Sequence, residues 1–480
     1  MPGSRPRLRR RDPGGRTQAL WVRPSRAEVR RRRQALRASL AAWRRAVEAV
    51  DPVARQGRVA QMVGLVIEAD GPAVEIGELL EVSRAGHPGG APLLAEAVGF
   101  RERRVLLMPL EGVGGLALGA LVTASGRRLA VACGDGLLGR VLDGLGRPVD
   151  GQGPVRADVW RDAEADPPPA MERLPIDQAL PVGVRAVDGL LTCGRGQRLG
   201  IFAGSGVGKS TLLGMLCRHT AADVAVVALV GERGREVREF LDLDLGAEAR
   251  PRTVVVVATS DQPAVVRLKA ALVATTVAEY FRDKGRDVLL VMDSLTRYAQ
   301  AMREVGLASG EPATTRGYTP SVFAALPRLL ERSGRAARGS ITGMYTVLVE
   351  GDDLNEPVAD AVRGLLDGHV VLSRRLAAQG HYPAIDVLQS VSRLATRLAS
   401  PEHAVAAQRL RTVLATYQQA EDLVDVGAYR TGTTPAIDHA LRWIEPVRGF
   451  LRQAREERAG WAETIQALAA LGTPDGGTAA

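Results

Sequence analysis

Lysine is nearly absent from this chain of 480 residues, which carries three lysines against 60 arginines. One of the three, Lys209, ends a glycine-rich run that begins at Gly204. A loop that cradles phosphates uses a compact ammonium on a flexible stem, which arginine does not supply. We therefore expect Lys209 to bind phosphate and the chain to bind a nucleotide.

Cysteine and long apolar runs are also scarce. Cys133, Cys193 and Cys217 are odd in number, widely spaced and free of CxxC pairs, which disfavours both a disulfide framework and a zinc site. No apolar run reaches the length of a membrane-spanning helix, and no apolar segment follows the basic start as a secretory signal would require. These absences predict a cytoplasmic protein.

The net charge of +9 is concentrated at one end. Residues 1–45 hold 15 arginines against Asp12 and Glu28, a charge of +13, which leaves −4 for the other 435 residues. Residues 1–25 lack periodicity and are expected to be a disordered basic tail. Residues 26–50 space their apolar side chains as one face of a helix, opposite a basic face. This amphipathic helix is expected to dock on its own domain or bind a partner.

The remaining chain divides by pattern into four parts. Residues 55–125 are rich in short β segments and predict a small β-barrel or sandwich, with strands at Gly57–Glu68, Val74–Val82, Leu94–Phe100 and Val105–Met108. Residues 126–180 are rich in glycine and proline and predict an irregular connection. Residues 181–394 show the α/β pattern of a parallel sheet. Residues 395–480 favour helices throughout.

The expected strands of the α/β part are short, continuous apolar runs: Arg198–Phe202, Val224–Val230, Thr253–Ala258, Val288–Met292 and Ile341–Val349. The first leads into the glycine-rich run, and a helix is expected from Lys209 to Cys217. Glycines let backbone N–H groups approach phosphates, and a helix N-terminus favours negative charge. The expected nucleotide-binding residues are Gly204, Ser205, Gly206, Val207, Gly208, Lys209, Ser210 and Thr211.

Two carboxylates follow buried strands of this sheet. Asp293 ends the run Val288–Met292, where open α/β sheets bind ligands, and is expected to hold Mg²⁺ through water while the Ser210 hydroxyl ligates it directly. Glu232 follows the run Val224–Val230 and is placed to orient a water molecule for attack on the γ-phosphate. From the residues alone, a solvated charged turn is an equal alternative for Glu232.

Several longer motifs carry a family resemblance. They are Leu138–Gly146, Cys193–Thr211, Gly231–Glu236, Asp293–Tyr298, Gly380–Asp386 and Ser390–Arg393. Together they resemble the export ATPases of bacterial type III secretion, which are relatives of the catalytic subunit of rotary ATP synthases. The resemblance implies an N-terminal β-barrel, a RecA-like P-loop ATPase core of the α/β class and a C-terminal helical domain, with ATP and Mg²⁺ as ligands.

The resemblance also assigns roles to single residues. Glu232 looks like the catalytic carboxylate of the family, and Arg393 matches its arginine finger, which reaches the nucleotide of a neighbouring subunit. Tyr382 matches the aromatic side chain that stacks on adenine. Arg233 is implied as a further catalytic residue, and Glu236 as a metal-site residue beside Ser210 and Asp293. A finger acting in trans implies a homo-hexameric ring.

Within the family, segments such as Thr259–Pro263 and Glu350–Pro357 look more like the flagellar branch than the branch of virulence injectisomes. That branch implies a stator-like regulatory subunit at the N-terminal helix, and contacts with export gate membrane proteins, export chaperones and flagellar substrates at the cytoplasmic face of the inner membrane. Two rivals stay open: a hexameric RNA helicase with the same core, and a subunit that binds nucleotide only structurally. The acidic body disfavours nucleic acid as a partner.

Overall fold

The computed structural model describes residues 9–11, 17–19, 43, 54–84, 91–349, 351 and 353–471, which fall into two units, 1–55 and 56–480. In the first unit, strand β1 (Arg9–Arg11) pairs antiparallel with β2 (Thr17–Ala19). The disorder expected for the tail is therefore wrong at these six residues, because composition does not reveal backbone pairing. The predicted helix at 26–50 lies outside the described residues except for Trp43, which is helical and exposed.

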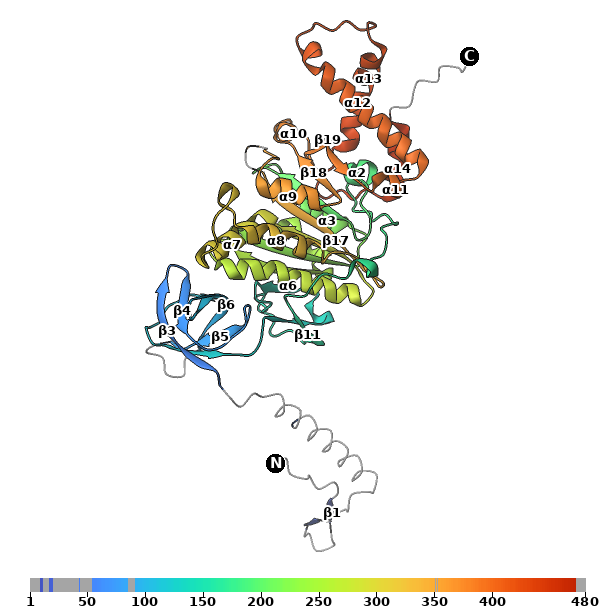
Figure 1. Cartoon of the computed structure of the whole chain (residues 1–480). Coiled ribbons are helices and arrows are strands. Elements are labelled where there is room, and N and C mark those ends of the chain that lie inside the picture. The colour runs from blue at the N-terminus through green and yellow to red at the C-terminus, as the bar shows by residue number, and fades with distance from the viewer. Residues whose placement is uncertain are drawn as a thin grey trace. The chain divides into compact units, whose positions relative to one another are not determined.

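A closed six-stranded barrel opens the second unit (Figure 1). Side chains on the inner face of its strands form an apolar centre that includes Ile67, Leu80 and Leu107. Around the barrel the strands run in the order β3 (Gln56–Val63), β4 (Val66–Asp70), β7 (Arg104–Pro109), β6 (Leu93–Arg101), β5 (Leu79–Val82) and β8 (Leu121–Ala124).

The first predicted strand of the barrel was wrong in one respect. Gly57–Glu68 was expected to be continuous, but the chain turns back after Val63, and Val63 pairs with Val66. Gly64 makes this turn possible because its φ of 58° lies in the left-handed region that glycine tolerates. The other three predicted strands overlap β5, β6 and β7.

The ATP-binding part predicted for 181–394 is built on a nine-stranded sheet that is mostly parallel. All five predicted strands are confirmed. Three further strands in this part were not predicted: β16, β18, and β19, which runs antiparallel to β18. The order across the sheet is β10 (Val141–Asp143), β14 (Thr253–Thr259), β13 (Val224–Glu232), β15 (Asp287–Asp293), β17 (Ser340–Leu348), β12 (Arg198–Ala203), β18 (Gly368–Leu372) and β19 (Ile385–Ser392), with β16 (Gly334–Arg335) paired to β17.

The segment 126–180 is less irregular than expected. Its residues Val141–Asp143 form β10, which pairs in parallel with β14 at the edge of the main sheet. The strands β9 (Ala130–Cys133) and β11 (Val159–Asp162) form a separate antiparallel pair. Glycine and proline obscured these strands because each is only three or four residues long and depends on partners distant in the sequence.

Helices cover both faces of the main sheet. One face packs against α6 (Ala264–Asp283), α7 (Leu295–Ala308), α8 (Pro320–Leu330) and α9 (Pro357–Leu365). The other face packs against α2 (Arg185–Leu190) and α3 (Lys209–His219). Shorter helices follow β13, β18 and β19: α4 (Gly234–Glu239), α10 (Arg374–Ala378) and α11 (Ala395–Leu398). After α4 come a π-helix at Phe240–Asp244 and α5 (Gly246–Ala249).

The C-terminal part of the described chain is helical, as predicted. It consists of α12 (Pro401–Asp425), α13 (Pro435–Leu451) and α14 (Trp461–Ala470), drawn in the red end of the colour range in Figure 1. Leu410, Val447 and Leu468 from these helices join the same apolar core as α2 and α3. Over the part of the chain that is described, no helix has both the length and the apolar character needed to cross a membrane.

Candidate functional site at the carboxyl edge of the sheet

The glycine-rich loop connects β12 to α3 at the carboxyl edge of the sheet. Gly206 and Gly208 have φ values of 78° and 86°, which turn the loop back so that α3 begins at Lys209. Ser210 is exposed at the first turn of α3, where backbone N–H groups are free to meet an anion. Thr211, in contrast, hydrogen-bonds to Asp244 of the π-helix. The loop therefore has the form that phosphate binding requires.

Lys209 points toward two carboxylates from neighbouring strands. Its Nζ lies 2.5 Å from Oδ1 of Asp293 and 3.5 Å from Oε1 of Glu232. Burial lowers the pKa of Lys209, but the two carboxylates outweigh burial and the net pKa is raised, so the ammonium is charged. The structure thus brings together three residues that the sequence predicted as site residues from three separate motifs.

Asp293 ends β15 and is almost completely buried. The hydroxyl of Thr346 on β17 donates a hydrogen bond of 2.7 Å to the same Oδ1 that faces Lys209. Sequence reasoning missed Thr346, because a threonine inside an apolar strand gives no signal of its own. Its contact holds the Asp293 carboxylate toward the loop.

Glu232 reaches the site through a bulge at the end of β13. The register against β14 shifts between Val230 and Glu232, and Gly231 between them has a φ of 71°. A Cβ at Gly231 would lie 3.0 Å from the Cβ of Arg297, so glycine also permits this close approach. Burial, followed by the nearby Asp293, raises the pKa of Glu232 to about 7, and a hydrogen bond with Glu236 adds to the rise.

Glu236 and Arg233 lie on the turn that follows. Glu236 accepts a hydrogen bond of 3.4 Å from Arg233, whose side chain is 75% exposed. Glu236 therefore contacts Glu232 on one side and solvent-exposed arginine on the other. Arg233 contacts neither Lys209 nor Asp293 among the interactions of the described residues.

The donor set suits a magnesium nucleotide better than a free-standing metal ion. The described residues contain no cluster of three or more histidine, cysteine, aspartate or glutamate side chains that could hold a metal. Mg²⁺ in phosphate-transfer sites is held by one or two protein oxygens together with the phosphates. The hydroxyl of Ser210 and the carboxylate of Asp293 supply oxygens of that kind beside the loop.

Tyr382 lies over the last glycine of the loop. A Cβ at Gly208 would be 3.4 Å from Cδ1 and Cε1 of the Tyr382 ring, and the tyrosine is 46% exposed. A core tyrosine, the alternative for an isolated aromatic residue, would be buried. The ring is instead available beside the phosphate loop.

Arg374 contacts the opposite end of the loop and was missed by sequence reasoning. A Cβ at Gly204 would lie 2.7 Å from Nε and Nη2 of Arg374. Among 60 arginines nothing distinguished this one. Together, Arg374 and Tyr382 enclose the loop from the segment that joins β18 to β19.

Arg393 lies at the amino ends of the parallel strands, whereas Lys209 lies beyond their carboxyl ends. It follows β19, and its neighbour Ser392 pairs with Gly368 at the start of β18. The other end of β18 lies near the phosphate loop, because Leu372 pairs with Ala203, the residue before the loop. The start and the end of β18 are four residues apart, so about 13 Å separates the Arg393 end of this strand from the loop end. Arg393 is exposed, and its backbone N–H bonds to the carbonyl of Asp367 at 3.0 Å.

Three family models match this chain. The ATP synthase alpha/beta family matches with its β-barrel domain at residues 59–126 and its nucleotide-binding domain at residues 183–392, and the T3SS EscN ATPase C-terminal domain matches at residues 399–470. A "Flagellum-specific ATP synthase" from Bacillus subtilis is 52% identical over 425 residues, which covers 88% of this chain and 97% of the relative. The chain belongs to the family of flagellum-specific ATP synthases and type 3 secretion system ATPases.

Members of both branches of the family are similar to this chain. The "SPI-2 type 3 secretion system ATPase" of Salmonella typhimurium is 53% identical over 411 residues, covering 85% of this chain and 93% of the relative. The assembled ATPase EscN from the type III secretion system of enteropathogenic E. coli matches in structure with a TM-score of 0.81 and 46% identity, over 86% of this chain and 98% of EscN. EscN has also been solved in complex with its central stalk EscO. The sequence-based family, fold class and ATPase activity are confirmed.

Proposed function

We propose that this ATPase energises bacterial type III protein export, with the flagellar branch as its system. ATP binds with its phosphates on the loop from Gly204 to Thr211 and its adenine against Tyr382. Lys209 would leave Asp293 to meet the phosphates, and Asp293 and Ser210 would hold Mg²⁺, which would neutralise charge on the transferring phosphoryl group. The enclosing contacts at Gly204 and Gly208 support this arrangement.

Glu232 acts on the attacking water in this proposal. Its carboxylate lies beside Lys209, and its raised pKa makes it a better proton acceptor than an ordinary glutamate. Glu236 shares a hydrogen bond with Glu232 and so helps to set its protonation. Arg233 lies on the exposed side of the same turn, where it is placed to meet a neighbouring subunit.

The position of Arg393 is the main observation that supports assembly into a ring. A finger at the opposite sheet edge from Lys209 does not reach the phosphate loop of its own chain, so the complete site needs a second copy. The solved assembly of the relative EscN supports the hexamer that the sequence implied. By analogy with EscN, a central stalk protein is a further partner, alongside the stator-like subunit, export gate, chaperones and export substrates.

Mixed rings test the shared site. Arg393→Ala and Lys209→Ala subunits are each expected to be inactive alone. Mixed in equal amounts, they form some interfaces that pair an intact Lys209 with an intact Arg393, so part of the ATPase activity should return. Mass spectrometry of the mixed rings confirms assembly. Confirmed mixed rings without any activity would reject Arg393 as a finger acting between subunits.

The injectisome branch remains the second candidate because the two relatives above are almost equally identical to this chain. Deleting the gene in its host distinguishes the branches. Loss of flagellar filaments and motility supports the flagellar function, while normal motility with loss of effector secretion supports the injectisome. The similarity to these two branches gives no support to the RNA helicase alternative, and RNA is expected to leave ATP hydrolysis unchanged.

A further inference from the structure

The segment 374–382 contacts the phosphate loop at both ends. Arg374 covers Gly204, and the ring of Tyr382 covers Gly208, four residues further along the loop. A displacement of this segment by even one ångström would alter both contacts. Whatever holds the segment in place therefore also holds the nucleotide site in place.

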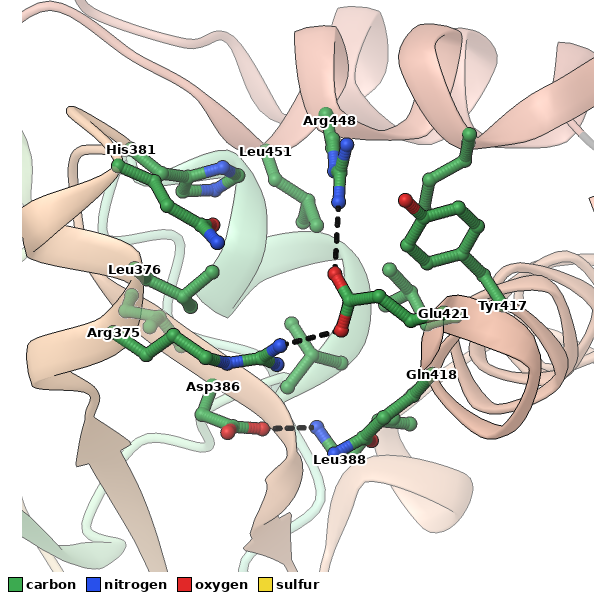
Figure 2. A pocket seen from close by; sticks show the side chains of 15 residues that line it. Arg375, Leu376, His381, Asp386, Leu388, Tyr417, Gln418, Glu421, Arg448 and Leu451 are labelled. Carbon is green, nitrogen blue, oxygen red and sulfur yellow. Dashed lines mark hydrogen bonds and ion pairs between the residues drawn. The ribbon is translucent and has the colours of Figure 1, made fainter. Parts of the chain in front are cut away.

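The other side of the same segment faces the C-terminal helices. Arg375, the neighbour of Arg374 on α10, donates a hydrogen bond of 2.6 Å from Nη1 to Oε2 of Glu421 on α12. The other oxygen of Glu421 lies 3.7 Å from Nη2 of Arg448 on α13. Figure 2 shows the Glu421 carboxylate between the two guanidinium groups. One carboxylate thus joins α10 to both helices.

The packing between α10 and these helices is interrupted by a small cavity. It has a volume of about 70 Å³ and is lined by apolar side chains that include Leu376, Leu414 and Leu451. His381 lines the same pocket, is almost completely buried, and has no hydrogen-bond partner at Nε2 among the described residues. Because this cavity interrupts the close packing, the polar contacts that cross it contribute to the position of α10.

A second bridge lies at the end of the segment. The backbone carbonyl of Tyr382 accepts a hydrogen bond of 2.9 Å from the N–H of Gln453, which follows α13. The side chain of Gln453 is itself bonded to Gly183 and Arg185 in the ATP-binding part. Gln453 fixes the Tyr382 end, and Glu421 adds a contact through Arg375 at the α10 end.

We infer that Glu421 is a positioning residue for the nucleotide site, acting through Arg375 to hold Arg374 and Tyr382 against the phosphate loop. The inference rests on the proposed binding of ATP at Lys209. Glu421 touches no phosphate, so it influences how well ATP is bound and leaves hydrolysis of bound ATP to Glu232, Asp293 and Arg393. A residue with a purely structural role would instead reduce the amount of active enzyme.

Steady-state kinetics of the assembled ring with Mg-ATP test this inference. The Arg375 side chain is half exposed, and such ion pairs are modest in strength, so Glu421→Gln should raise KM about threefold with kcat nearly unchanged. Arg375→Gln should raise KM by the same factor. The double variant should be no worse than either single variant, because both remove one interaction.

Glu445→Gln is the matched control. Glu445 accepts a hydrogen bond of 2.8 Å from the same Arg448 but lies on α13 without a bond to α10. Its KM should equal that of the wild type. An unchanged KM in Glu421→Gln, additive effects in the double variant, or an equal rise in Glu445→Gln would each overturn the inference. A wild-type ring that fails to hydrolyse ATP would overturn the proposed function instead.

Discussion

The ion pair between Lys209 and Asp293 predicts how Mg²⁺ and ATP depend on each other. In the structure the lysine that should meet the phosphates is bound to the carboxylate that should meet the metal, at 2.5 Å and with both side chains largely buried. ATP without Mg²⁺ must draw Lys209 away and leave Asp293 with the Thr346 hydroxyl as its main partner. With Mg²⁺ present, Asp293 would help to hold the metal, and the charge of its carboxylate would stay compensated.

The size of this effect follows from the cost of an unpaired buried charge. Removing one partner of a buried ion pair costs about 3–5 kcal/mol. Here the phosphates compensate Lys209 and only the Asp293 half is left unpaired, so we take about 2 kcal/mol, a factor of about 30 in the dissociation constant. Asp293→Asn keeps an oxygen for Thr346 and removes the charge. It should therefore bind metal-free ATP about 30-fold more tightly than the wild type does, and Mg-ATP more weakly.

Fluorescence titration with a fluorescent ATP analogue, in EDTA and in Mg²⁺, measures both affinities. Ser210→Ala is the control, because it removes an expected metal ligand without touching the pair, and it should weaken only the binding measured in Mg²⁺. The opposite signs expected for Asp293→Asn are not produced by general damage to the site. If Asp293→Asn binds the analogue in EDTA no more tightly than the wild type, the exchange of partners by Lys209 is wrong.

Three further outcomes are expected. Glu232→Gln should bind Mg-ATP with an affinity close to wild type and lose turnover by at least 100-fold in a phosphate-release assay, since it removes the base and keeps the side-chain shape. Gly214→Ala should lower the free energy of unfolding by about 1–3 kcal/mol in urea, because its Cβ would lie 2.4 Å from the carbonyl oxygen of Asp244. Burial, followed by Arg452 and Arg448, lowers the pKa of His381 to about 4, so the stability of the protein should fall as the pH drops from 6.5 toward 4. The melting temperature of the His381→Phe variant should fall less over that range than the melting temperature of the wild type.

The sequence was a good guide wherever structure depends on neighbours along the chain. The phosphate loop needs a strand, glycines and a helix in direct succession, and Arg198–His219 contains all three. Strands buried on both faces, such as β13 and β15, are uniform apolar runs in the sequence. These local signals were enough to place Lys209 at the start of the helix after the loop, and Glu232 and Asp293 at strand ends.

Contacts between distant segments had no such signal. The three residues of β10 are a strand only because β14, more than 100 residues later, offers its edge. Nothing in the sequence around Glu421 distinguishes it from other glutamates of a helix, and its proposed role depends on its contact with Arg375 on another helix. Arg374 can approach the loop this closely because Gly204 has no side chain. In each case the partner, and not the residue itself, determines what the residue does.

The same distinction explains why the proposed site is divided between chains. A parallel sheet collects the ends of its strands at one edge, so Lys209, Glu232 and Asp293 gather there whatever else the chain does. The antiparallel turn into β19 returns the chain to the opposite edge before Arg393, about 13 Å away along β18. A parallel continuation would have needed a crossover to bring the next strand end to the loop. The direction of one edge strand therefore leaves Arg393 exposed and away from the loop of its own chain, as the proposed role at the nucleotide of a neighbouring subunit requires.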